Sequence, residues 1–154
     1  MTLPTLTEMD PLSISLACIT LIGAISKTST VVTNFVRDVR GVKAELDGVS
    51  RELQSLKAVL ETLANDAGDP TNSVLPETLK RQIAGIVTNC MGVVVEIEHT
   101  LERHEVTGLA KAARWKAIGL GDILKLRSSL EAHKAALEIA LDMVTLYGYP
   151  VISR

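Results

Sequence analysis

Apolar positions recur at steps of three and four along four long stretches of this chain, and turn-forming residues separate the stretches. Such spacing places apolar side chains on one face of an α-helix. The clearest seam alternates the two steps through Val42, Leu46, Val49, Leu53, Leu56, Leu60 and Leu63. Charged residues occupy many of the positions in between. The pattern predicts a helix that buries one stripe and exposes the rest.

The first helix is predicted to begin at Asp10 and Pro11, because an aspartate accepts hydrogen bonds from first-turn amides and proline has no amide to leave unpaired. This helix is apolar on nearly every side. We expect its main stripe to hold Leu12, Leu16, Ile19, Ile22 and Ile25, with Ile14, Cys18 and Leu21 on the other sides. A helix that is apolar all round lies at the centre of a bundle or in a membrane.

Two further helices follow the break expected at Gly41 and a turn-rich loop at 65–74. The third helix restarts at Pro76 and Glu77, and we expect Gly85 and Gly92 to admit a closely packed neighbouring helix. Its seam holds Leu79, Ile83, Ile86, Cys90, Val93, Ile97 and Leu101. The last seam, which ends near Gly148, holds Ile123, Leu126, Leu130, His133, Leu137, Ala140 and Val144.

These four helices predict an all-α, antiparallel four-helix bundle over residues 10–148, with an extra short helix or a kink near 109–122. Residues 1–9 would form an N-terminal extension, and residues 149–154 the start of a linker to a missing C-terminal region. The length of 154 residues suits one domain. A net charge of −2 gives no reason to expect nucleic-acid binding.

The opening stretch from Pro11 to Ser26 is uncharged, yet it is shorter than the ~20 residues that span a bilayer. Glu8 and Asp10 stand where a secretory signal carries Lys or Arg, so we expect a cytoplasmic protein. Cys18 and Cys90 lie within apolar stretches, which is typical of buried, reduced thiols.

The sequence contains no catalytic, metal-binding or cofactor motif that we recognise, so we expect a protein that is not an enzyme and has no cofactor. His99 and His104 are five residues apart and do not share a helical face. His133 reads as a hydrogen-bonded core histidine.

One cluster, Lys111, Arg114, Trp115 and Lys116, combines the only Trp with three cations. Trp and cations both favour the interface of an anionic membrane, so the cluster is a candidate interfacial edge. A partly buried Trp with solvated neighbours is the alternative interpretation.

Three segments carry a resemblance to a known family: MDPLSISLACITLIGAIS, VRDVRGVKAELDGVSRELQSLKAVLETL and RWKAIGLGDILKLRSSLEAHKAALEIAL. From Met9 to about Leu146 the chain resembles the fungal HeLo-like N-terminal domain found at the head of many NLR-type (STAND) proteins. The resemblance implies an all-α bundle placed before a nucleotide-binding and repeat-bearing region or before an amyloid signalling motif.

The resemblance also implies a function in fungal programmed cell death, including heterokaryon incompatibility. Relatives oligomerise on activation and release a hydrophobic N-terminal helix into the plasma membrane. Here that helix would insert through Leu12, Ile14, Leu16, Ile19, Leu21, Ile22 and Ile25. Its implied partners are other copies of the chain and anionic membrane lipids.

Two other functions stay open: a non-toxic interaction or self-association domain of a multidomain fungal signalling protein, and a bundle that carries a small ligand or lipid. Charged substitutions distinguish the cell-death effector from the non-toxic interaction domain. A charge at Leu16 or Ile19 is expected to damage folding, whereas a charge at Ser13 or Ser15 is expected to abolish only membrane action.

Overall fold

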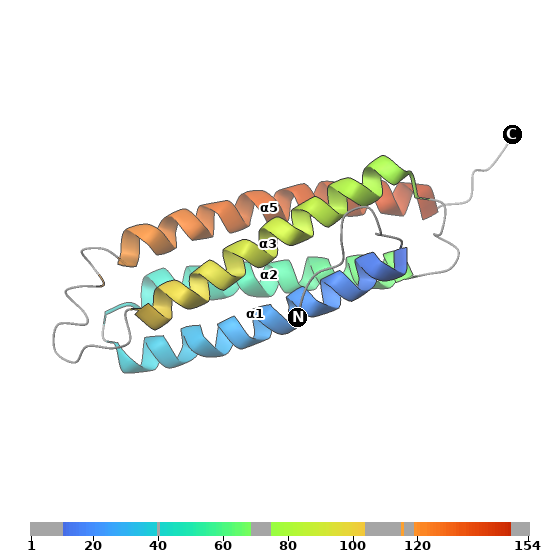
Figure 1. Cartoon of the computed structure of the whole chain (residues 1–154). Coiled ribbons are helices and arrows are strands. Elements are labelled where there is room, and N and C mark those ends of the chain that lie inside the picture. Colours follow the sequence, from blue (N-terminus) through green and yellow to red (C-terminus); the bar gives the residue numbers. More distant parts are fainter. Residues whose placement is uncertain (1–10, 40, 69–74, 104–114, 116–118, 149–154) are drawn as a thin grey trace, which may run out of the picture.

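The computed structural model describes residues 11–39, 41–68, 75–103, 115 and 119–148, with the side chains of 11–13, 67, 68 and 148 excepted. Four helices occupy this part of the chain: α1 (Pro11–Asp38), α2 (Lys43–Gly68), α3 (Glu77–Arg103) and α5 (Leu120–Gly148) (Figure 1). The described residues contain no strand. The all-α four-helix prediction is therefore confirmed.

The helix ends follow the local signals in the sequence. Gly41 has a φ of +84° between α1 and α2, a conformation that glycine adopts without the steric cost of a Cβ atom. The Val39 amide donates to the Phe35 carbonyl at 2.9 Å, which closes the last turn before this break. At the other end of the bundle, α3 starts directly after Pro76. Proline suits a position at a helix start because it has no amide to leave unpaired.

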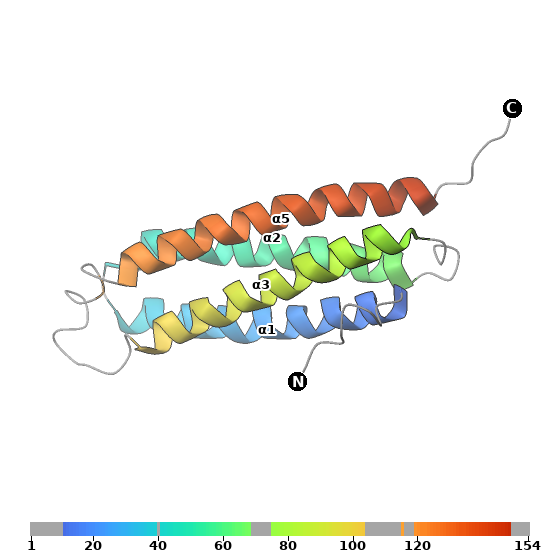
Figure 2. The same ribbon diagram turned by 45° about the horizontal axis from the view of Figure 1, so that its top comes forward.

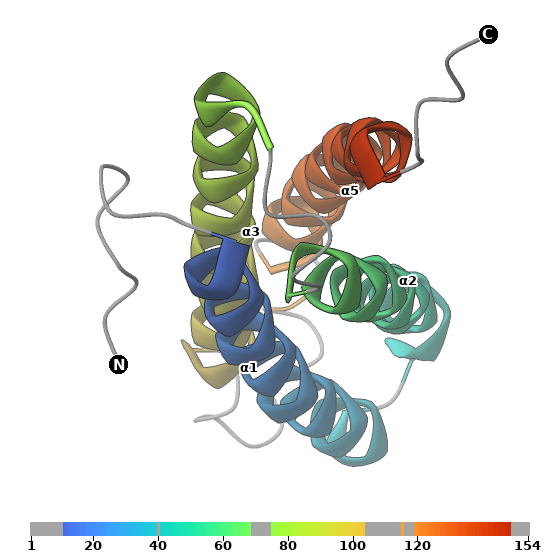
Figure 3. The ribbon, with the colours of Figure 1, turned by 90° about the vertical axis from the view of Figure 1, so that its right-hand side faces the viewer.

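Successive helices run in alternating directions, and α3 crosses the bundle obliquely (Figures 1 and 2). Viewed from one end, α1 and α5 occupy opposite corners, and each packs against both α2 and α3 (Figure 3). Consequently α1 has one antiparallel neighbour, α2, and one parallel neighbour, α3. The start of α1, the start of α3 and the end of α5 all lie at the same end of the molecule.

The core lies along the axis between the four helices and is almost entirely aliphatic. All seven residues of the seam predicted for α2 are buried there. In α3 and α5 the predicted seams are also buried, except that Ile86, Leu126 and His133 lie at the margins and are only partly buried. Each fully buried aliphatic side chain contributes about 1.5–3 kcal/mol, so the seams account for the closed bundle.

His133 is held within its own helix: its Nδ1 lies 2.6 Å from the Ser129 carbonyl oxygen, one turn earlier in α5. The histidine is thus hydrogen-bonded at the edge of the core.

The predicted extension at 1–9, the linker at 149–154 and most of the predicted short helix or kink near 109–122 lie outside the described residues.

The glycines of α3 do not have the role that their spacing suggested. A Cβ atom built on Gly85 or Gly92 would have no neighbour within 4 Å, so neither glycine is needed for a close helix approach. A different glycine, Gly48 of α2, does have a close neighbour, which is a side chain of α5. There a Cβ atom would collide with the guanidinium of Arg127, which lies across the α2 backbone.

Candidate functional site

The candidate site is α1 together with the surfaces of α2 and α3 that cover it. Steps of four and three relate buried positions along α1, with Ala17 buried beside them: Ile14, Cys18, Leu21, Ile25, Thr28, Val32 and Phe35. The predicted stripe through Leu16 and Ile19 is wrong, because these side chains are 55% and 56% exposed. Both stripes are apolar, so the period of the pattern alone could not distinguish the inner face from the outer face.

The residues proposed to enter a membrane divide between these two faces. Ile14, Leu21 and Ile25 are buried against the bundle, and Ile22 is partly buried. Leu16 and Ile19 form the outer apolar ridge of α1, the name used below for these two side chains. The side chain of Leu12 lies outside the described part of the chain. For all of these side chains to enter a membrane, α1 would therefore have to detach from α2 and α3.

By length and composition, the stretch Ile14–Asp38 is sufficient to cross a membrane, and 33% of its most apolar window is buried in the bundle. Core helices of soluble proteins meet the same criterion. The finding agrees with either interpretation of a helix that is apolar all round.

Ser15 is not a free position on α1. Its Oγ donates to the Ala64 carbonyl oxygen of α2 at 3.1 Å, and the residue is half-buried. A carboxylate there would displace this hydrogen bond and enter the α1–α2 contact. The expectation that a charge at Ser15 spares folding, while a charge at Leu16 damages it, is therefore reversed by the structure.

A buried carboxylate joins α1 to α3. Glu98 of α3 places Oε1 3.0 Å from the Lys27 ammonium, and Thr28 Oγ1 donates to Oε2 at 3.5 Å. The hydrogen bond from Lys27 to Glu98, together with the charge of that carboxylate, raises the pKa of the Lys27 ammonium. The sequence held one indication that Glu98 is buried. It lies next to Ile97 and three residues before Leu101, so it falls close to the apolar side of α3.

Both cysteines lie in the contact between α1 and α3. Cys18 and Cys90 are free thiols and fully buried, as expected. Burial raises the pKa of each thiol to about 12, and the nearby Cys90 adds to the shift at Cys18. The thiolate is the reactive form of cysteine, so both groups are unreactive while α1 stays docked.

Trp115 is not an interfacial residue. Its side chain is buried and its ring lies at 51° to the Phe35 ring of α1, with the centroids 4.8 Å apart. A tilted pair at this distance is a favourable aromatic geometry. The prediction of an interfacial aromatic at Trp115 is therefore wrong. Its basic neighbours Lys111, Arg114 and Lys116 lie outside the described residues.

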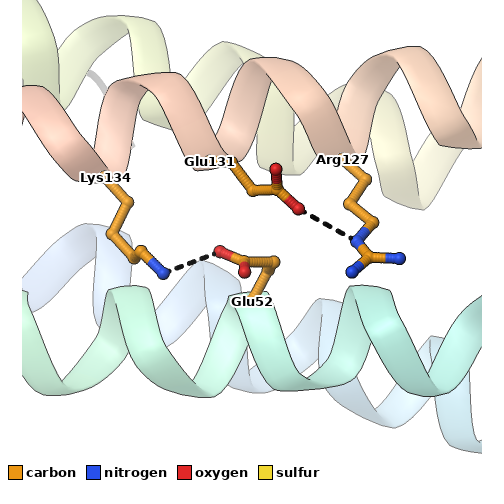
Figure 4. Close-up of polar contacts among 4 residues, drawn as sticks. All are labelled: Glu52, Arg127, Glu131 and Lys134. Atoms are coloured by element: carbon orange, nitrogen blue, oxygen red, sulfur yellow. Dashed lines mark hydrogen bonds and ion pairs between the residues drawn. The ribbon is translucent and has the colours of Figure 1, made fainter.

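A charged seam fixes α5 on α2, opposite the site (Figure 4). The Lys134 ammonium lies 3.0 Å from a Glu52 carboxylate oxygen, and both side chains are largely buried. Arg127 donates to Glu131 at 3.1 Å while its guanidinium crosses Gly48. These residues were missed in the sequence, where charges between apolar positions read as solvated surface.

A second apolar surface covers the last turns of α5. Ile139, Leu146 and Tyr147 are exposed, Ile139 by 64% and Leu146 by 72%. Beside them a hollow of about 430 Å³ opens between α3 and α5, with Gly85 and Ile86 on one side and Ile139 and Met143 on the other. We call Ile139, Met143, Leu146 and Tyr147 the α5 patch.

Among the described residues, no group of three His, Cys, Asp or Glu side chains is placed to hold a metal ion. His99 is exposed on α3, and His104 lies outside the described residues.

A family model described as pigment biosynthesis cluster protein PigL N-terminal matches residues 9–151. No curated protein matches the chain, and no solved structure matches it. The matched span includes all four helices, the candidate site and the α5 patch.

Proposed function

This chain belongs to the family of PigL N-terminal domains of pigment biosynthesis cluster proteins, and for this member we propose a membrane-directed effector function. In the proposal α1 is a core helix at rest and a membrane helix after activation. The domain is then cytoplasmic at rest and moves to the plasma membrane when it is activated. It acts by insertion and self-assembly, without catalysis and without a cofactor.

The observation that carries the proposal is the composition of α1 on both of its faces. The inner face packs apolar side chains against α2 and α3, and the outer apolar ridge adds Leu16 and Ile19. No charged residue interrupts the helix from Ile14 to Ser26. A core helix of a water-soluble bundle usually carries charged residues on its outer face, and here three turns have none.

Contacts of α1 with the rest of the bundle favour a helix that can detach. Between described residues, the polar ties of α1 to the other helices run from Ser15 to Ala64, from Gln54 to Ser29, and from Lys27 with Thr28 to Glu98. The buried face of α1 is otherwise mostly apolar, and lipid tails offer apolar side chains a comparable environment. A two-state helix of this kind needs only a modest difference in free energy between its two environments.

The resemblance to HeLo-like domains supports the biological setting that we propose, which is fungal cell death or innate immunity. In this setting a downstream NLR or amyloid-motif region would supply the activating signal, and other copies of the domain would supply the oligomer. Anionic lipids of the inner leaflet would attract the exposed cations of the protein.

Dye release from vesicles of mixed phosphatidylcholine and phosphatidylserine tests the proposal. Leu16→Asp places a charge on the outer apolar ridge, so it should keep the fold and abolish release. Leu124→Asp is the matched control, since Leu124 is also an exposed leucine but lies on α5. Release that survives Leu16→Asp with the bundle intact would contradict insertion of α1.

The second candidate function is a self-association or docking domain, and the α5 patch favours it. Four large apolar side chains gathered at one end of a helix are typical of a surface that meets a partner. Ile139→Asp should then abolish self-association, measured by light scattering, while Leu16→Asp has no effect. Loss of dye release in Leu16→Asp, with release kept in Ile139→Asp, would instead identify the effector function.

A further inference from the structure

Glu98 is the most deeply buried charged residue among those that the structure describes. It lies on α3, yet both of its carboxylate oxygens are engaged by consecutive residues of α1. Oε1 is 3.0 Å from the Lys27 ammonium and Oε2 accepts from Thr28 at 3.5 Å. Lys27 and Thr28 of α1 therefore compensate the Glu98 carboxylate only while α1 is packed against α3.

A largely buried carboxylate is costly unless a cation and hydrogen bonds compensate it. Desolvation and attraction nearly cancel in an intact pair, but removal of the cation leaves the full cost of the buried anion. The docking of α1 consequently depends in part on the Lys27 ammonium, whose exposure to solvent weakens its attraction to Glu98. A purely apolar contact would have no such dependence.

The two partners differ in their access to solvent. The Lys27 side chain is 72% exposed, whereas the Glu98 side chain is 12% exposed. The cation is thus available to a second anion from outside, while the carboxylate is largely buried and contacts Lys27 and Thr28 of α1. Lys27 also follows directly on the uncharged stretch that holds the outer apolar ridge.

A lysine at the edge of an apolar helix surface matches the chemistry of an anionic bilayer. The apolar side chains enter the acyl region, and the ammonium stays with the phosphate and carboxylate headgroups. A zwitterionic bilayer offers the first of these interactions and much less of the second. The surface formed by Leu16, Ile19 and Lys27 therefore suits phosphatidylserine better than phosphatidylcholine.

We infer that Lys27 and Glu98 form a latch that keeps α1 docked on α3, and that an anionic lipid surface opens the latch by drawing Lys27 to its headgroups. The inference rests on the proposed function, whose regulation it names. Loss of Lys27 to the lipid leaves Glu98 buried without a cation, so contact with the bilayer and release of α1 favour each other.

The reporter for this latch is Cys90, which the docked α1 keeps buried and which stays on α3 when α1 leaves. Its alkylation by N-ethylmaleimide is read by mass spectrometry, in buffer and with vesicles of phosphatidylcholine alone or mixed with phosphatidylserine. For the natural chain we expect slow alkylation in buffer and with phosphatidylcholine. Phosphatidylserine should accelerate it.

Three variants test the latch itself. Lys27→Met should alkylate at Cys90 up to about fivefold faster in buffer, with no further response to phosphatidylserine. Adding Glu98→Gln to Lys27→Met removes the buried charge and should restore slow alkylation, a rescue that loss of packing would not give. Glu98→Gln alone keeps the fold and should alkylate slowly in buffer and with both vesicles.

The control for net charge is Lys125→Met, which removes an exposed lysine of α5 and should behave as the natural chain. A natural rate of alkylation in Lys27→Met, or a failure of Glu98→Gln to rescue it, would overturn the latch. A full response of Lys27→Met to phosphatidylserine would overturn the lipid trigger. Should the alkylation results follow the expected pattern without any dye release, the latch stands and the proposed permeabilising function fails.

Discussion

Ile14 and Leu16 stand two residues apart on α1 and face opposite ways: Ile14 is fully buried against the bundle, and Leu16 lies on its outer surface. The two residues are similar in size and hydrophobicity. The difference between them comes only from the direction in which the helix presents them. This difference in burial separates the α1 residues on which folding depends from those that are exposed and can contact a membrane.

Aspartate substitutions at these two positions should separate stability from activity. Ile14→Asp buries an unpaired carboxylate and should lower the free energy of unfolding by more than about 3 kcal/mol. Leu16→Asp should change it by no more than about 0.5 kcal/mol, because the side chain is exposed. Urea denaturation followed by circular dichroism measures both. A large loss in Leu16→Asp would show that the outer ridge is part of the core.

Trp115 and Phe35 form the aromatic pair at the α1–α2 turn end of the bundle, and its loss should destabilise the fold. Trp115→Ala should cost about 3–5 kcal/mol, as is usual when a large buried aromatic is truncated. Tyr147→Ala is the control, since Tyr147 is an exposed aromatic of the α5 patch and should cost little. Thermal unfolding measures both variants. A negligible effect of Trp115→Ala would contradict a stabilising role for the aromatic pair.

Gly92→Ala should stabilise the domain. The position lies inside α3, is exposed, and leaves a Cβ atom free of neighbours within 4 Å. Alanine then gains helix propensity of about 0.5–1 kcal/mol without a steric cost. The midpoint of urea unfolding should rise. A lower midpoint would restore the idea that Gly92 serves a close helix contact.

The buried thiols predict a loss of stability at alkaline pH. Burial raises the pKa of Cys18 and of Cys90 from 9.0 to about 12, so the folded state favours the protonated thiol. The contribution of the two protonated thiols to the free energy of unfolding is complete below pH 9.0 and is lost as the pH rises toward about 12. The raised pKa of Lys27 acts in the same direction at higher pH.

The melting temperature should therefore fall more steeply above pH 9.0 in the natural chain than in Cys18→Ala/Cys90→Ala. Equal slopes in the two proteins would mean that the thiols do not resist ionisation in the fold. Differential scanning calorimetry across this range makes the comparison.

The sequence predicted the architecture well where one stripe is apolar and the rest is charged. In α2 the positions from Val42 to Leu63 have this contrast, and all of the predicted seam is buried. In α1 the contrast is missing, so Ile14 and Leu16 could not be assigned to opposite faces before the neighbouring helices were in place. Period and composition determine a helix, whereas its rotation depends on what it packs against.

Buried charges were the other point at which sequence reasoning failed. Glu98 was not singled out and Glu52 was expected on the surface, because a carboxylate is rarely buried without a partner. Their partners Lys27 and Lys134 come from α1 and α5, distant in the sequence, and only the tertiary arrangement brings each pair together. Trp115 was misassigned for the same reason, since its partner Phe35 is also distant in the sequence.

The most direct test of the central claim is the environment of α1 on a membrane. Ile19→Cys creates an exposed thiol that a polarity-sensitive maleimide dye labels selectively at neutral pH, because Cys18 and Cys90 are buried and protonated. Ile139→Cys provides the matched site on α5. With vesicles containing phosphatidylserine, the account predicts that dye at position 19 shifts to the blue and is quenched by spin-labelled lipid tails, while dye at position 139 stays in water. Dye that remains in a polar environment at position 19 during vesicle binding would contradict the entry of α1 into the bilayer.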